Sequence, residues 1–186
     1  RSAPLPTGGS LEQADGTAWM AFYCQNMLEM ALILADRDPH YEDVAFKFVQ
    51  HFMWIAYAMD RIGDHHDEMW DEADGFFYDV LRLPDGSATR LKVRSMVGLL
   101  PLCASTVFEP DFAAKFPRLM ELIKLFRDRY PEVMAQVAPT AEGYIGYNGR
   151  RSLSPLSQTR LERVLRYLLD ENEFLSPYGI RSVSKY

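Results

Sequence analysis

Residues 44–59, with the sequence VAFKFVQHFMWIAYAM, are apolar almost all the way round the helix that their spacing predicts. Val49 and Met53 share one face of this helix, and Phe48 and Phe52 nearly complete the circle. Polar residues interrupt the run, which is also shorter than the roughly 20 residues that a membrane-spanning helix needs. Such a helix must be packed on two sides, which indicates a protein built from layered helices.

The other segments divide into helices, loops and one hairpin. Ser10 has the character of an N-cap, and Gln13 follows three positions later as in a capping box, so a long helix should begin here. Pro39 should end that helix, and Pro117 should kink a later one. Asp-Gly at the centre of PDGS, between two alternating stretches, predicts a tight turn. We therefore expect helices over residues 10–35, 41–62, 111–129 and 158–170, a short helix around Pro101, and a β-hairpin over residues 75–93.

Helices of about 20 residues that are apolar on two sides carry too much apolar surface for a small bundle. The sequence therefore predicts a mainly all-α fold in which helical hairpins are layered, as in an α/α toroid, with one β-hairpin near residues 75–93. A chain of 186 residues is long enough for one domain with a core of its own.

Charge and cysteine content restrict the classes of partner. The formal net charge is −6 and the isoelectric point about 5.2, which argues against a nucleic-acid partner and against an anionic membrane surface. Cys24 and Cys103 stand apart, without a CxxC motif or a Cys/His pair at zinc spacing, so we expect two buried, reduced thiols. Solitary thiols fit a reducing compartment, and we expect a cytoplasmic protein.

The run GDHHDEMWDEAD contains His65, His66 and six carboxylates, which raises the question of a metal site. Ala73 and Gly75 stand where a calcium loop would need ligands, and no second histidine or cysteine has zinc spacing. A solvated acidic loop is the interpretation that these spacings favour. Phosphate-binding and dinucleotide-binding glycine motifs are also missing from the sequence, so we expect neither a metal nor a cofactor.

The segment LEQADGTAW places Glu12, Gln13, Asp15 and Trp19 near the start of the first expected helix. Acidic residues at a helix N-terminus stabilise the helix, so capping alone would explain them. They would equally suit the rim of a cleft, where Gln13 or Asp15 binds sugar hydroxyls and Trp19 stacks on a sugar ring. Composition alone leaves both interpretations open.

The segment FFYDV alternates as a strand does, which would place Phe77 and Asp79 on one face and Phe76, Tyr78 and Val80 on the other. Paired aromatic residues on a hairpin usually belong to a core. An aspartate in mid-strand is unusual. Asp79 should therefore either pair with a cation, such as Arg94, or line a site.

Four stretches occur in a recognisable order: LEQADGTAWMAFYCQNMLEMA, MWDEADGFFYDVLRLPDG, RSMVGLLPLCA and FLSPYGIRSVSKY. In this order they resemble the catalytic domain of glycoside hydrolase family 63 and its bacterial relatives, including mannosylglycerate-hydrolase-like enzymes. The resemblance covers nearly the whole chain, and its most specific parts are the GFFYDV hairpin and the FLSPYGIRS loop.

The resemblance implies an (α/α)6 barrel that hydrolyses α-linked glucosides or mannosides with inversion. Inversion needs an acid and a base about 6.5–9.5 Å apart. In the family these carboxylates would fall before Arg1 and after Tyr186, so the resemblance implies that residues 1–186 are one partial domain, inactive alone, with no catalytic residue of its own. The substrate-lining residues that it implies are Glu12, Gln13, Asp15, Trp19, Tyr78, Arg94 and Tyr178.

Two other hypotheses remain open. The chain could be a complete enzyme in which Asp15 and Glu173 form the acid–base pair, although nothing in the sequence fixes those two together. It could also be a non-catalytic scaffold or carbohydrate-binding protein, because fold does not imply function. We expect an oligosaccharide or small glycoside as ligand. We also expect homo-oligomers, because a toroid segment would expose apolar helix faces.

Overall fold

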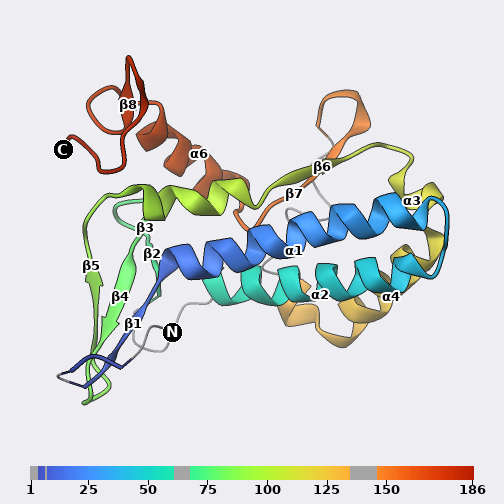
Figure 1. Cartoon of the computed structure of the whole chain (residues 1–186), viewed down its shortest axis with the longest axis horizontal. Coiled ribbons are helices and arrows are strands. Elements are labelled where there is room, and N and C mark those ends of the chain that lie inside the picture. The colour runs from blue at the N-terminus through green and yellow to red at the C-terminus, as the bar shows by residue number, and fades with distance from the viewer. Residues whose placement is uncertain (1–3, 7, 61–67, 135–145) are drawn as a thin grey trace.

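The computed structural model describes the chain apart from residues 1–3, 7, 61–67 and 135–145 (Figure 1). Its helical elements are α1 (Ala14–Ala35), α2 (Tyr41–Asp60), the 3-10 helix η1 (Met96–Cys103), α3 (Phe112–Lys115), α4 (Pro117–Arg129), the 3-10 turn η2 (Tyr147–Gly149) and α6 (Gln158–Leu168). Its strands are β1 (Ser10–Glu12), β2 (Trp70–Asp71), β3 (Phe76–Phe77), β4 (Asp79–Arg82), β5 (Ala88–Leu91), β6 (Thr106–Phe108), β7 (Arg151–Leu153), β8 (Leu175–Ser176) and β9 (Gly179–Ile180).

The two long helices α1 and α2 run antiparallel, side by side along the molecule (Figure 1). The buried face of α1 carries small residues such as Ala18, Ala21 and Ala31, which lets the two helices approach closely. On its other side α2 packs against α4. The prediction that the apolar second helix is packed on two sides is therefore confirmed.

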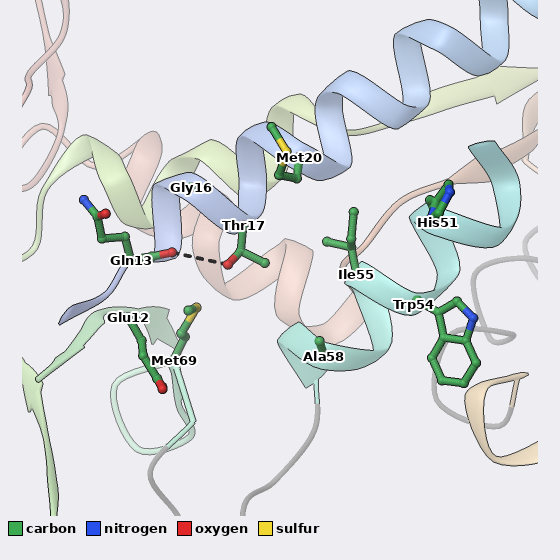
Figure 2. Close-up of a pocket in the computed structure, with 10 residues that line it drawn as sticks. All are labelled: Glu12, Gln13, Gly16, Thr17, Met20, His51, Trp54, Ile55, Ala58 and Met69. Atoms are coloured by element: carbon green, nitrogen blue, oxygen red, sulfur yellow. Dashed lines mark hydrogen bonds between the residues drawn. The ribbon is translucent and has the colours of Figure 1, made fainter. Parts of the chain in front are cut away.

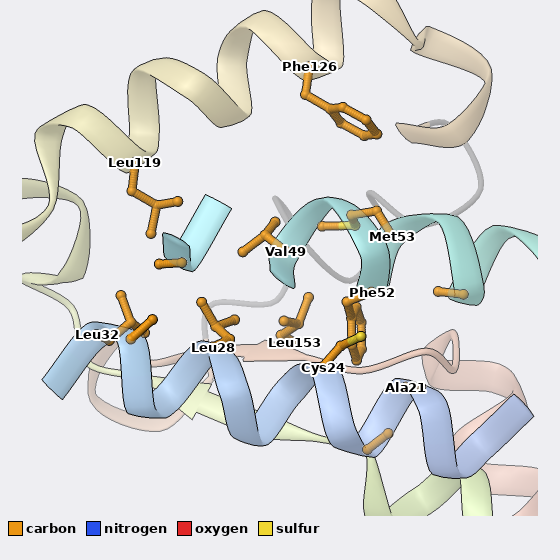
Figure 3. Close-up of a cluster of buried hydrophobic side chains, with 14 of the residues drawn as sticks. Ala21, Cys24, Leu28, Leu32, Val49, Phe52, Met53, Leu119, Phe126 and Leu153 are labelled. Atoms are coloured by element: carbon orange, nitrogen blue, oxygen red, sulfur yellow. The ribbon is translucent and has the colours of Figure 1, made fainter. Parts of the chain in front are cut away.

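The larger hydrophobic core fills the space between α1, α2 and α4 (Figure 3). Cys24 and Leu28 of α1 face Phe52 of α2, while Leu119 and Phe126 approach α2 from α4. Leu153 of β7 closes the same cluster, so a small strand pair seals a core made mainly by helices.

The predicted kink at Pro117 is a break between two helices. α3 ends at Lys115, and α4 begins with Pro117 at its first position, where the missing N–H costs no hydrogen bond. The buried Glu42 of α2 accepts a hydrogen bond from the backbone N–H of Leu119 at 2.7 Å. A carboxylate from one helix thus caps the next.

The expected helix start at Ser10 is wrong. Ser10–Glu12 form β1, which pairs antiparallel with β4 so that Glu12 lies opposite Val80, and α1 begins only at Ala14. The capping box is not made, because Ser10 lies in β1 and Gln13 is itself the N-cap residue, without a side-chain cap. Instead Asp79 Oδ1 accepts a hydrogen bond from the N–H of Ala14 at 2.8 Å.

The predicted β-hairpin is confirmed as β4 and β5, which pair antiparallel and extend the sheet to the order β1-β4-β5. Its turn contains Gly86, whose φ of +86° favours glycine. The segment FFYDV is not one strand, because β3 pairs with β2 and β4 begins after Tyr78. Phe76 and Phe77 are consequently both buried, and the expected alternation between two faces does not occur.

A second hydrophobic core lies between these strands, η1 and α6. Its largest buried residues are Trp70, Phe76, Phe77 and Phe174. A side chain at Gly98 of η1 would have its Cβ 2.2 Å from the Phe76 ring, so glycine permits the close approach of η1.

The prediction of an all-α toroid fragment is wrong. The described residues are 52% helical and 17% strand, and they contain four small antiparallel sheets rather than one hairpin. The sequence prediction failed because β1, β2, β6 and β7 are strands of two or three residues. Strands this short form through partners distant in the chain and carry little periodicity of their own. The helices in the described part of the chain include none with the length and apolar character to cross a membrane.

Candidate functional site

A polar pocket of about 440 Å³ opens beside the second core. We call it the hairpin pocket, because its walls come mainly from the β3–β5 region and from the C-terminal stretch that runs alongside. Backbone hydrogen bonds from Met96 N to Ser182 O and from Ser184 N to Arg94 O, at 2.7 and 2.8 Å, hold that stretch in place. The pocket is lined by Asp74, Tyr78, Lys92, Val93, Arg94, Val183 and Tyr186.

Tyr78 supplies a buried hydroxyl to this pocket. The residue is 2% exposed, and its hydroxyl donates a hydrogen bond to Asp74 Oδ2 at 2.9 Å. Burial raises the pKa of Tyr78 to about 12, since the charged phenolate would lose hydration. At neutral pH Tyr78 is therefore a fixed, uncharged hydrogen-bonding group.

Lys92 bridges two carboxylates at the edge of the pocket. Its Nζ lies 2.8 Å from Asp71 Oδ2 and 3.1 Å from Asp74 Oδ2. These contacts, the one with Asp71 foremost, raise the pKa of Lys92. Burial acting alone would raise the pKa of Asp71, but hydrogen bonds from Lys92 and from the Asp74 N–H outweigh it and lower that pKa. Lys92 and Asp71 are thus both charged at neutral pH.

Arg94 also lines the pocket. Its guanidinium group lies over the rings of Tyr167 and Tyr186, at 4.8 and 4.6 Å from their centroids. It also pairs with the buried carboxylate of Glu173, which accepts a further hydrogen bond from the Ser184 hydroxyl. Asp79, the partner suggested by the sequence, caps α1 instead.

A second, larger pocket of about 650 Å³ lies between the first turns of α1 and the last turns of α2 (Figure 2). We call it the interhelix pocket. Glu12 is held there by Arg82, which donates from Nε and Nη2 at 3.1 and 3.2 Å. The hydroxyl of Thr17 donates to the backbone oxygen of Gln13 at 3.3 Å. The pocket is lined by Glu12, Gln13, Gly16, Thr17, Met20, His51, Trp54, Ile55, Ala58 and Met69.

The structure divides the seven predicted substrate-lining residues. Glu12 and Gln13 line the interhelix pocket, whereas Tyr78 and Arg94 meet in the hairpin pocket. The remaining three, Asp15, Trp19 and Tyr178, line neither.

The contacts of those three residues are local. Asp15 Oδ1 accepts a hydrogen bond from the N–H of Gly16 at 2.7 Å, next to it in the sequence. Trp19 is half exposed and meets the Phe22 ring edge to face, and Tyr178 is fully exposed in the β8–β9 turn. Their role toward a substrate stays a prediction.

Asp15 and Glu173, the alternative acid–base pair, do not share either pocket. Glu173 is 7% exposed and is occupied by Arg94 and Ser184, while Asp15 lies at the start of α1. This arrangement gives no support to a catalytic pair made by these two residues.

Sequence reasoning missed Asp74, Lys92 and Tyr186 as pocket residues. One signal was present for Lys92, because Arg90, Lys92 and Arg94 alternate along TRLKVR as residues on one face of a strand do. Asp74 and Tyr186 reach the pocket from the β2–β3 turn and the C-terminal stretch, and only the folded chain brings them together.

The remaining predictions concern metals and thiols. Among the described residues, no group of three or more histidine, cysteine or carboxylate side chains could hold a metal ion. His65 and His66 lie outside the described residues. Cys24 is a buried free thiol as predicted, but Cys103 is exposed at the end of η1, so that prediction is wrong for Cys103.

Comparison with known proteins gives a relative without an assigned activity. No protein-family model matches the chain. It is 44% identical over 198 residues to a protein of Saccharomyces cerevisiae (strain ATCC 204508 / S288c) named "Uncharacterized protein YMR196W". The alignment covers 100% of this chain and 18% of the yeast protein, so the chain spans less than a fifth of that relative's length. The yeast protein thus contains a segment similar to the whole chain.

Proposed function

We propose that this chain forms a carbohydrate-binding wall of a glycoside hydrolase that cleaves α-linked glucosides or mannosides with inversion. The observation that carries the proposal is the hairpin pocket, where Tyr78 and Arg94 are fixed beside Asp74, Lys92 and the ring of Tyr186. The proposed reaction, inverting hydrolysis of an α-glycosidic bond, rests on the resemblance of four sequence stretches to glycoside hydrolase family 63.

The hairpin pocket offers what a hexose requires. Sugar hydroxyls both donate and accept hydrogen bonds, and the pocket presents a carboxylate acceptor on Asp74 together with N–H donors on Lys92 and Arg94. Val93, Val183 and the Tyr186 ring provide apolar surface for the C–H faces of a sugar. The groups are held by contacts with one another, so a ligand would meet them already ordered.

The same contacts indicate binding rather than bond cleavage by these residues. An inverting hydrolase needs one carboxylic acid free to protonate the leaving oxygen and one carboxylate free to activate water. Asp74 is engaged by Tyr78 and Lys92, and Glu173 by Arg94 and Ser184. In this proposal the acid and the base come from parts of a longer protein.

A non-catalytic carbohydrate-binding protein is the second candidate. It is favoured by the occupied state of two carboxylates: Asp74 in the hairpin pocket is bound by Tyr78 and Lys92, and Glu173 beside it by Arg94. The two candidates share the binding site and differ in whether the longer protein hydrolyses its ligand.

The binding test uses the 186-residue chain. Maltose and α-mannobiose are titrated into 15N-labelled protein, and we expect saturable shifts of the amides of residues 92–94. Tyr78→Phe should weaken binding severalfold, because it removes a hydroxyl at the pocket. Tyr147→Phe, at an exposed position of η2 that does not line the hairpin pocket, is the matched control and should change nothing. If neither sugar shifts these amides, the carbohydrate proposal is overturned.

Hydrolysis is tested on the full-length yeast relative. We expect the enzyme to release 4-nitrophenol from 4-nitrophenyl α-glucoside or 4-nitrophenyl α-mannoside. The first sugar product in the proton NMR spectrum should have the β configuration. Sugar binding by the chain without hydrolysis by the longer protein would favour the non-catalytic candidate. A retained anomeric configuration would contradict inversion.

A further inference from the structure

An apolar pocket of about 140 Å³ lies between α2, the α3–α4 segment and the β6–β7 strand pair, and it shares no lining residue with either pocket described above. We call it the Arg151 pocket. It is lined by Val49, Met53, Phe108, Glu109, Pro110, Phe112, Ala113, Met120, Ile123, Arg151, Ser152 and Leu153.

The interior of this pocket is hydrocarbon. Val49, Met53 and Leu153 belong to the larger core (Figure 3) and also line this pocket. Phe108 and Phe112 stack with ring centroids 4.4 Å apart and form one wall. An apolar cavity of about 150 Å³ in another protein stays dry and binds benzene. The Arg151 pocket therefore has room for one group of about benzene size.

The polar end of the pocket is cationic. Arg151 faces Phe108 across the β6–β7 pair, and the two-residue period of a strand places it on the same side as the buried Leu153. Within the described residues, no carboxylate forms an ion pair with Arg151. The nearby acid Glu109 is held by Arg150, at 3.0 Å from Nη2 and 3.2 Å from Nε, which offsets its charge.

We propose that the Arg151 pocket binds a small monocarboxylate whose apolar group is about the size of benzene. The apolar group would lie on Met53 and Ile123, and the carboxylate would accept hydrogen bonds from the Arg151 guanidinium at the mouth. An anionic ligand gains from Arg151, whereas a neutral molecule of the same shape gains only the apolar contact. This inference is independent of the carbohydrate proposal.

The test compares phenylacetate with 2-phenylethanol, which share the phenyl group and differ in charge. Each is titrated into the 186-residue chain labelled with 13C at the methionine methyl groups. Met53 and Met120 line the pocket and should shift saturably, while Met30, exposed on α1, should not move. We expect phenylacetate to bind about fivefold more tightly, the gain of one partly exposed charge pair.

Three variants assign the effect. Arg151→Gln should abolish the fivefold preference and leave the affinity for 2-phenylethanol unchanged. Arg166→Gln, the same charge change on α6, should keep the preference. Ala113→Leu should fill the pocket and weaken both ligands, and Ala113 is exposed enough to accept the larger side chain. The proposal is overturned if the wild type shows no saturable shift, if it binds both ligands equally, or if Arg166→Gln removes the preference.

Discussion

Asp79 on β4 caps α1 across 65 positions of sequence: its Oδ1 accepts a hydrogen bond from the backbone N–H of Ala14 at 2.8 Å. Gln13, which directly precedes the helix, makes no side-chain cap. The adjoining β1 pairs with β4, the strand that carries Asp79. The position of the first helix is therefore fixed by a strand that follows it by more than forty residues.

Removing this cap should destabilise the protein. We expect Asp79→Ala to lower the free energy of unfolding by about 1–2 kcal/mol, because the N–H of Ala14 loses its acceptor in a buried place. Asp79→Asn keeps an acceptor oxygen and should lose less. Urea unfolding followed by circular dichroism measures both. Asp128→Ala on the exposed side of α4 is the control, and equal midpoints for Asp79→Ala and wild type would show that the cap contributes nothing.

Arg94 and Glu173 should be strongly coupled. Their side chains are 19% and 10% exposed, so Arg94→Met would leave a nearly buried carboxylate without its cation. We expect a loss of about 2–4 kcal/mol in the free energy of unfolding. Glu173→Gln should cost less, and the double variant should be more stable than the sum of the single losses predicts, by at least about 1 kcal/mol. Additive losses in this double-mutant cycle would contradict the coupling.

Tyr78 should make the protein sensitive to alkali. Its pKa is about 12 in the folded protein and close to the ordinary value of 10 in the unfolded chain. Between pH 10 and pH 12 the unfolded chain therefore binds fewer protons at this group, so its contribution to stability is complete below pH 10 and is lost as the pH rises. The wild type should lose stability relative to Tyr78→Phe across this range.

A spectroscopic titration checks the same group directly. Absorbance at 295 nm should show a late tyrosine ionisation near pH 12 that is missing from Tyr78→Phe. A difference spectrum centred near pH 10 would mean that the hydroxyl is not buried in solution.

The outer side of α1 should mediate self-association. Trp19, Tyr23, Met30, Ile33 and Leu34 are each at least 45% exposed, and their spacing places them along one side of the helix. An apolar strip of this extent is uncommon on a monomer. We expect concentration-dependent dimers in analytical ultracentrifugation. Ile33→Glu should shift the equilibrium to the monomer. Leu125→Glu, equally accessible on α4, should leave the dimers intact, and a monomer at every concentration would refute the prediction.

The sequence predicted the parts of the fold that depend on local spacing. The two long helices and the hairpin follow from periods of 3.6 and 2 within single segments. β1 escaped prediction because a strand of three residues has no readable period and exists only through its pairing with β4. Asp79 shows the same limit, since an aspartate in a strand does not reveal which distant N–H it caps.

The sequence indicated some of the residues that line the two pockets, but not how they are grouped. Tyr78 and Arg94 were expected near a common cleft, and both line the hairpin pocket. Glu12 and Gln13 line a different pocket, because β1 places them at the end of the helix pair and away from the hairpin turn. Tyr178 lies in the β8–β9 turn and is fully exposed to solvent, which the surrounding motif did not predict.

The distant cap on α1 has a kinetic consequence. The antiparallel α1–α2 pair needs only contacts close in sequence. The β1–β4 pairing and the cap by Asp79 can form only after a loop of 65 residues has closed. We therefore expect the helix pair to form early and the sheet to dock on it late. In stopped-flow experiments Asp79→Ala should then accelerate unfolding and leave the refolding rate almost unchanged. The N-terminal end of α1 would be the last part of that helix to become ordered and the first to open.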